Sequence, residues 1–88
     1  MVSSQRDRSE NMKIEELQNR LNRIVRIEHP YDNASVRVED TNDYPTIAVI
    51  VINYNDGIIE DVADFLERND YRCVDHYTTG NEFHIHIQ

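Results

Sequence analysis

Apolar residues recur at helical spacing in the first third of the chain. Beginning after Asn11, they are separated mostly by three or four positions, which places them on one side of a helix. Asn11 can cap the first turn. Pro30 disfavours helical geometry at His29, so the helix is predicted to end near Glu28. The apolar stripe consists of Ile14, Leu17, Leu21, Ile24, Val25 and Ile27.

Two further segments have the patterns of β-strands. Ala34, Val36 and Val38 alternate with polar residues, which predicts a strand with one buried face. Within residues 46–53, the run 47–52 is apolar at both odd and even positions and rich in β-branched side chains. That pattern predicts a central strand covered on both sides, and the polar segment 41–45 predicts the turn before it.

The remaining third predicts a helix followed by a hairpin. The helix begins with Asp56 as its cap and ends near Asn69, and its buried stripe is Ile58, Ile59, Val62, Phe65 and Leu66. Segments 71–77 and 81–87 form the hairpin. The residues between them, Thr78 to Gly80, suit a three-residue loop with Gly80 in the left-handed conformation.

These elements give the order α-β-β-α-β-β. The predicted fold class is α+β, a four-stranded antiparallel sheet with two amphipathic helices in a single domain over residues 11–88. Residues 1–10 are polar and aperiodic, and are predicted to be a disordered tail. One face of the central strand can take the second helix. The first helix then either covers the other face or packs beside the second helix and leaves a sheet face for a partner.

A homodimer is favoured over a monomer, because closed two-fold dimers are the commonest oligomers. The stripe of the first helix also has the beginning of a heptad pattern. The candidate interface residues are Ile14, Leu17, Leu21 and Ile24.

The charge composition indicates a salt-rich environment. Seventeen acidic residues stand against eight Arg and one lysine, Lys13, at a net charge of −8. Salt screens repulsion between carboxylates, so this balance favours a halophile, or a virus or plasmid of one. An ordinary acidic protein is the alternative. Cys73 is the single cysteine, which excludes an intramolecular disulfide. No stretch reaches the ~20 apolar residues of a membrane span. We expect a cytoplasmic protein or a virion component without a cofactor.

The histidines near the C-terminus suggest a metal site as one alternative. The predicted loop would place His76 opposite Glu82, on the face that also carries His84 and His86. Imidazole and carboxylate groups can bind zinc, copper or nickel, although a solvated or interface face explains the pattern better, since a metal site needs three or four ligands in tight geometry. The metal-site candidates are His76, Glu82, His84 and His86.

Nucleic-acid binding is the other alternative, since Arg20, Arg23 and Arg26 decorate the first helix and could contact phosphates. Nearby acidic residues dilute that patch. Cys73 and His76 would fall on opposite faces of a regular strand, so Cys73 is predicted to be a small buried thiol rather than a nucleophile. The sequence thus favours a non-enzymatic protein–protein interaction module that forms a homodimer, with no small-molecule substrate. The alternatives are a small nucleic-acid-binding regulator and a metal-binding protein.

Overall fold

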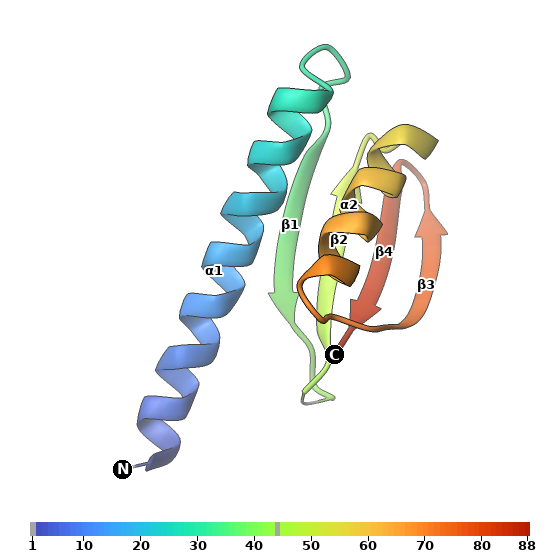
Figure 1. Ribbon diagram of the computed structural model, residues 1–88. Coiled ribbons are helices and arrows are strands. Elements are labelled where there is room, and N and C mark those ends of the chain that lie inside the picture. The colour runs from blue at the N-terminus through green and yellow to red at the C-terminus, as the bar shows by residue number, and fades with distance from the viewer. Residues whose placement is uncertain (1, 44) are drawn as a thin grey trace.

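The computed structural model describes the backbone of residues 2–43 and 45–88, and the side chains of residues 14–43 and 45–88. Its elements follow the predicted order and are shown in Figure 1. They are α1 (Val2–Glu28), β1 (Ser35–Asp40), β2 (Ile47–Ile52), α2 (Asp56–Arg68), β3 (Cys73–Thr79) and β4 (Glu82–Ile87). The predicted α+β fold is therefore confirmed.

The four strands form one antiparallel sheet in the order β1-β2-β4-β3. Two hairpins, β1–β2 and β3–β4, lie side by side through the pairing of β2 with β4. Helix α2 joins β2 to β3, which are not neighbours, so β4 lies between them. As a result β1 and β3 are the two edge strands.

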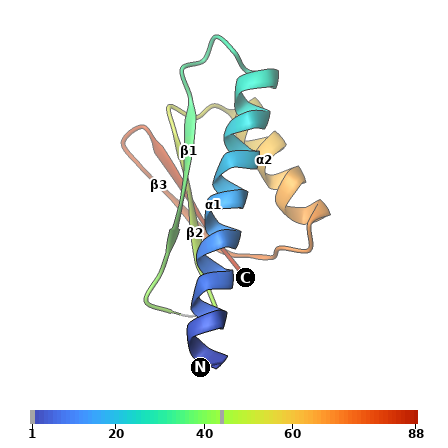
Figure 2. The ribbon, with the colours of Figure 1, turned by 90° about the vertical axis from the view of Figure 1, so that its left-hand side faces the viewer.

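Both helices lie on the same face of the sheet, as Figure 2 shows. The core forms between them and that face. Its fully buried side chains include Leu21 of α1, Val49 and Val51 of β2, and Ile58 and Val62 of α2. Of the two arrangements that the sequence left open, the first helix packs beside the second and the opposite sheet face is left without a helix.

The limits of α1 agree with the prediction at one end only. The helix ends at Glu28, as the following His29-Pro30 pair predicted. It begins at Val2, well before the predicted start at Asn11, so the backbone of the predicted tail is helical. Residues 2–10 contain no Gly or Pro, and extending a helix is much easier than nucleating one.

The N-terminal cap of α2 is Asn55 rather than the predicted Asp56. Asn55 has an extended backbone, and its side-chain oxygen accepts a hydrogen bond from the N–H of Ile58 at 2.9 Å. Asp56 then occupies the first turn, where its charge favours the positive end of the helix. At the other end Asn69 is the C-terminal cap, as predicted.

The β3–β4 hairpin has a shorter loop than predicted. Two residues, Gly80 and Asn81, make the loop, and Thr79 pairs with Glu82. Gly80 has φ +58°, a left-handed conformation that suits the first position of a two-residue turn. His76 lies opposite Ile85 instead of Glu82, a shift of three positions. Because side chains alternate between the faces of a strand, an odd shift reverses the faces of β3 relative to β4. The predicted pairing of His76 with Glu82 is wrong for this reason.

A β-bulge modifies the start of β3. The register shifts between Cys73 and Asp75, so that Cys73 lies opposite Ile87 and His76 opposite Ile85. The extra residue brings Cys73 and His76 to the same face of the sheet, the one that carries the helices. Their predicted placement on opposite faces is therefore wrong.

Candidate functional site: a sheet with one open edge

The outer edge of β1 is closed by side-chain amides of α1. Asn22 donates to the carbonyl of Val36 at 2.6 Å and accepts from the Val36 N–H at 2.8 Å. Gln18 accepts from the N–H of Val38 at 2.9 Å. Both outward groups of Val36 and the outward N–H of Val38 are thus bonded within the chain, which leaves this part of the edge with few free groups for an added strand.

The spacing of these amides matches the spacing of the strand. Gln18 and Asn22 are four residues apart, which is about 6 Å along a helix axis at ~1.5 Å per residue. Val36 and Val38 are two residues apart, which is about 6.7 Å along a strand at ~3.3 Å per residue. Two amide side chains at positions i and i+4 of a helix can therefore form hydrogen bonds with successive outward-facing residues of a strand beside it. Gln18 and Asn22 were not among the predicted site residues, although their position next to the apolar stripe was the available signal.

Strand β3, at the other edge, is exposed at all seven of its positions. In the loop-closing pair, Thr79 and Glu82 exchange hydrogen bonds, and in an antiparallel pair such bonded positions alternate. Tyr77 therefore bonds β4, whereas the N–H and C=O of His76 and Thr78 point outward. The N–H of His76 confirms this direction, because it donates to the side chain of its neighbour Asp75 at 2.9 Å. No described strand or helix covers this edge.

The sheet face without helices carries an aromatic cluster. The rings of Tyr77 and His84 stack with centroids 4.6 Å apart, and the ring of His86 meets Tyr77 edge-on at 5.8 Å. Nε2 of His84 lies 3.0 Å from a carboxylate oxygen of Glu82. Beneath them Ile50 is only 3% exposed, covered by side chains of the neighbouring strands.

The four metal-site candidates do not come together. Glu82, His84 and His86 share the open face, as predicted, but His76 lies on the other face and stacks on Phe83 with centroids 5.7 Å apart. Among residues 14–43 and 45–88, no three side chains of His, Cys, Asp or Glu are placed to hold a metal ion.

An apolar groove of about 470 Å³ runs along β3 on the helix side of the sheet. Its walls include Ile59 and Ala63 of α2 and Phe83 of β4, and Cys73 lines it together with His76. Cys73 is exposed, so the prediction of a buried thiol is wrong. Its sulfur donates to the carbonyl of Asp75 at 3.5 Å. The groove exists because α2 packs over β2 and β4 and does not extend over β3.

The predicted interface stripe of α1 is mostly used within the chain. Leu17 and Leu21 are buried in the core, and Ile14 is half-buried against it. Ile24 is half-buried, whereas Ile27 is 65% exposed. A dimer contact centred on Leu17 and Leu21 would therefore require the core to open.

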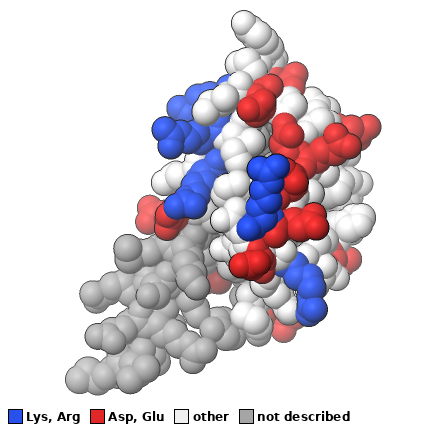
Figure 3. Space-filling model, in the orientation of Figure 1, with Lys and Arg blue, Asp and Glu red and all other residues white. Residues whose placement is uncertain are grey.

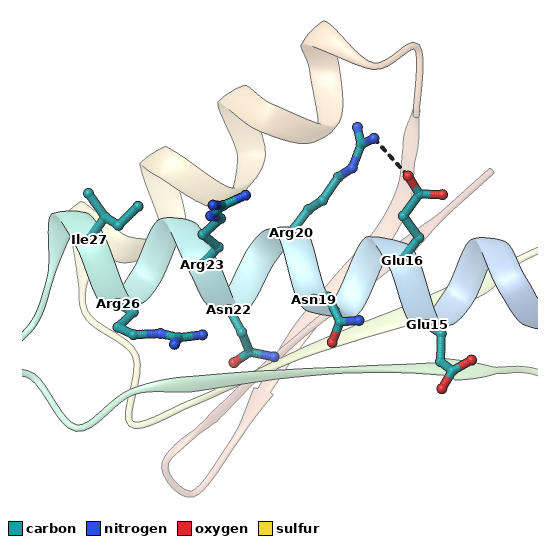
Figure 4. Close-up of a pocket in the computed structure, with 8 residues that line it drawn as sticks. All are labelled: Glu15, Glu16, Asn19, Arg20, Asn22, Arg23, Arg26 and Ile27. Carbon is teal, nitrogen blue, oxygen red and sulfur yellow. Dashed lines mark hydrogen bonds and ion pairs between the residues drawn. The ribbon is translucent and has the colours of Figure 1, made fainter.

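The three arginines of α1 line a shallow groove of about 660 Å³, drawn in Figure 4. Arg20 is paired with Glu16 at 2.7 Å. Arg20 and Arg23 project from one side of the helix and Arg26 from the other, so the three do not converge on one point. On the face drawn in Figure 3, basic side chains gather over α1 and acidic ones over α2.

No helix in the described part of the chain is long and apolar enough to cross a membrane. Comparison with protein-family models finds no family that matches this chain. Searches of curated proteins and of solved structures likewise find no match. The contacts and exposure of the chain itself therefore carry the functional argument.

Proposed function

We propose that this protein is a non-enzymatic protein–protein interaction module that works as a homodimer. The observation that carries the proposal is the exposure of β3 along its whole length, although the strand includes Val74 and Tyr77. These two side chains are 45% and 46% exposed. Exposed apolar side chains on an edge strand are typical of a contact surface.

The contrast between the two edges supports the same conclusion. Natural proteins usually protect an exposed edge strand, because its free N–H and C=O groups can pair with another chain. Here the β1 edge is closed by Gln18 and Asn22. The β3 edge has a bulge between Cys73 and Asp75 and one local hydrogen bond, which the N–H of His76 donates to the side chain of Asp75. Both lie in the first part of the strand, so the rest of the edge is unprotected.

The acidic composition supports a salt-rich setting for this module, in the cytoplasm of a halophile or in a virion of one of its viruses. A net charge of −8 on each copy opposes association at low ionic strength. The screening length falls to ~3 Å at 1 M salt, which removes most of that opposition.

The test is the molar mass of the purified protein, measured by light scattering on a size-exclusion column over a range of concentrations at molar salt. We expect twice the chain mass of 10.4 kDa at high concentration, with dissociation on dilution. The mass of a single chain at every concentration and salt level would refute the homodimer.

A nucleic-acid-binding regulator is the second candidate, and one observation favours it. Within the described residues Arg23 and Arg26 form no ion pair, and both line the groove on α1. Titration of labelled duplex DNA, followed by fluorescence anisotropy, would test it. If this candidate is correct, Arg23→Ala weakens binding and the exposed, matched Arg37→Ala does not.

A further inference from the structure

We infer that a second copy of this chain pairs with the first through β3, antiparallel about a two-fold axis at Tyr77, which joins the two sheets into one. The inference rests on the proposed homodimer and specifies its contact. It follows from the edge that is available, from the direction of the backbone groups and from the charges that face one another.

Only one kind of strand pairing is open to this chain. Pairing of β3 with β1 of another copy would continue indefinitely and form a fibre. That pairing would have to break hydrogen bonds already made, since Gln18 and Asn22 bond both outward groups of Val36 and the N–H of Val38. Pairing of β3 with β3 uses the same strand on both copies, so it closes at two chains.

The backbone selects the register of this pairing. In an antiparallel ladder the bonded pairs form between outward-facing residues, and in the part of β3 after the bulge these are His76 and Thr78. An axis at Tyr77 places His76 of each copy opposite Thr78 of the other, so both outward residues are paired. An axis at His76 would pair Thr78 with the bulged Val74. An axis at Thr78 would pair His76 with Gly80, which belongs to the turn.

Side chains across the contact agree with this register. Asp75 of each copy comes to lie opposite Thr79 of the other, and the two Tyr77 rings face each other beside their own His84 partners. An axis at Asp75 would instead set two carboxylates directly opposite, which is unfavourable. Pairing also replaces the local bond between the His76 N–H and Asp75 with a bond to a strand carbonyl.

The register can be tested by disulfide trapping. Tyr77→Cys and Thr79→Cys are each made with Cys73→Ser, which leaves one thiol per chain. The Cα atoms of two residues facing across an antiparallel pair are ~4.5–5.5 Å apart, within the range of a disulfide. Two Thr79 positions would be about 13 Å apart in the inferred register, since four residues of strand separate them.

In oxidised glutathione at molar salt, the Tyr77→Cys variant should form a cross-linked dimer on a non-reducing gel, and the Thr79→Cys variant should remain monomeric. Equal cross-linking of both variants, or none with Tyr77→Cys when light scattering shows a dimer, would overturn the inferred contact. A wild-type chain that is monomeric under all conditions overturns the proposed function itself, so the two failures are distinguishable.

A second pair of variants tests the backbone bonds directly. Thr78→Pro removes an N–H that points away from β4, and Thr78→Ala keeps it. Thr78→Pro should raise the dimer dissociation constant by on the order of tenfold or more, because the lost bond occurs twice in the symmetric contact. Thr78→Ala should dimerise almost like the wild type. The inference is contradicted if the Thr78→Pro variant has a native circular dichroism spectrum and dimerises with unchanged affinity. If that variant does not fold, the disulfide cross-linking of the Tyr77→Cys and Thr79→Cys variants is the deciding test.

Discussion

Replacing Asn22 with alanine should test how much the closed edge of β1 contributes to stability. The substitution removes both hydrogen bonds to Val36 and leaves a part-buried N–H and C=O without partners. Each lost bond is worth ~0.5–1.5 kcal/mol, and an unsatisfied buried group costs up to ~3 kcal/mol. Alanine has a higher helix propensity than asparagine, which offsets about 0.5 kcal/mol of this loss in the free energy of unfolding. The net loss should be about 2 kcal/mol, or about 10 °C in melting temperature for a domain of this size.

The assay is urea unfolding at molar salt, followed by circular dichroism, with Asn19→Ala as the matched control. Asn19 is an exposed asparagine on the same helix and forms no hydrogen bond to β1 in the described structure, so its replacement changes helix propensity equally and leaves the bonds to Val36 and Val38 in place. Asn22→Ala should also form assemblies larger than a dimer, because a second strand edge becomes available. If Asn22→Ala unfolds at the same urea concentration as Asn19→Ala, the amide does not stabilise the edge and the reasoning fails.

Three further predictions concern salt, the junction of the helices and the histidines. The melting temperature should rise steadily from near-zero to molar salt, and an unchanged temperature in circular dichroism melts would remove the argument for a halophilic origin. Nε2 of His29 lies 2.7 Å from the carboxylate of Asp61 in α2, so replacing His29 should lower the free energy of unfolding, measured in urea, by about 1–2 kcal/mol. Tyr31 is exposed in the same loop, and Tyr31→Ala should leave that free energy almost unchanged. Elemental analysis of untagged protein should find no stoichiometric zinc, copper or nickel; one bound metal per chain, lost in a His84→Ala/His86→Ala variant, would instead establish a metal site.

The hydrophobic pattern predicted the elements and the core because both depend on spacing along the chain. The i, i+3, i+4 positions of α1 and α2 and the alternation in β1 fix which side chains face inward, and Leu21, Val36 and Val62 are buried accordingly. The exposed Ile27 shows the limit of this reasoning: at about 100° per residue it lies about 120° around the helix from the buried Leu21, so it points away from the core.

The candidate site could be predicted only in part, because its geometry depends on single residues. The hairpin loop is one residue shorter than predicted and lies further along the chain, so the register shifts by three positions and moves His76 away from His84 and His86. One bulge then brings it to the side of Cys73. Neither a loop length nor a bulge changes the hydrophobic pattern enough to be read from one sequence. The amides of α1 were missed for a different reason, since a polar residue beside a stripe normally faces water.

The exposure of β3 and the closure of β1 are two consequences of one arrangement. A helix is about 10 Å across, and strands are about 4.8 Å apart, so one helix covers roughly two strands. Two helices placed squarely on the sheet would cover all four strands. Helix α1 instead lies along the outer side of β1, where Asn22 can reach its backbone, and α2 follows over β2 and β4. The same displacement that closes one edge therefore leaves β3 uncovered, and the proposed pairing with a second copy would cover it.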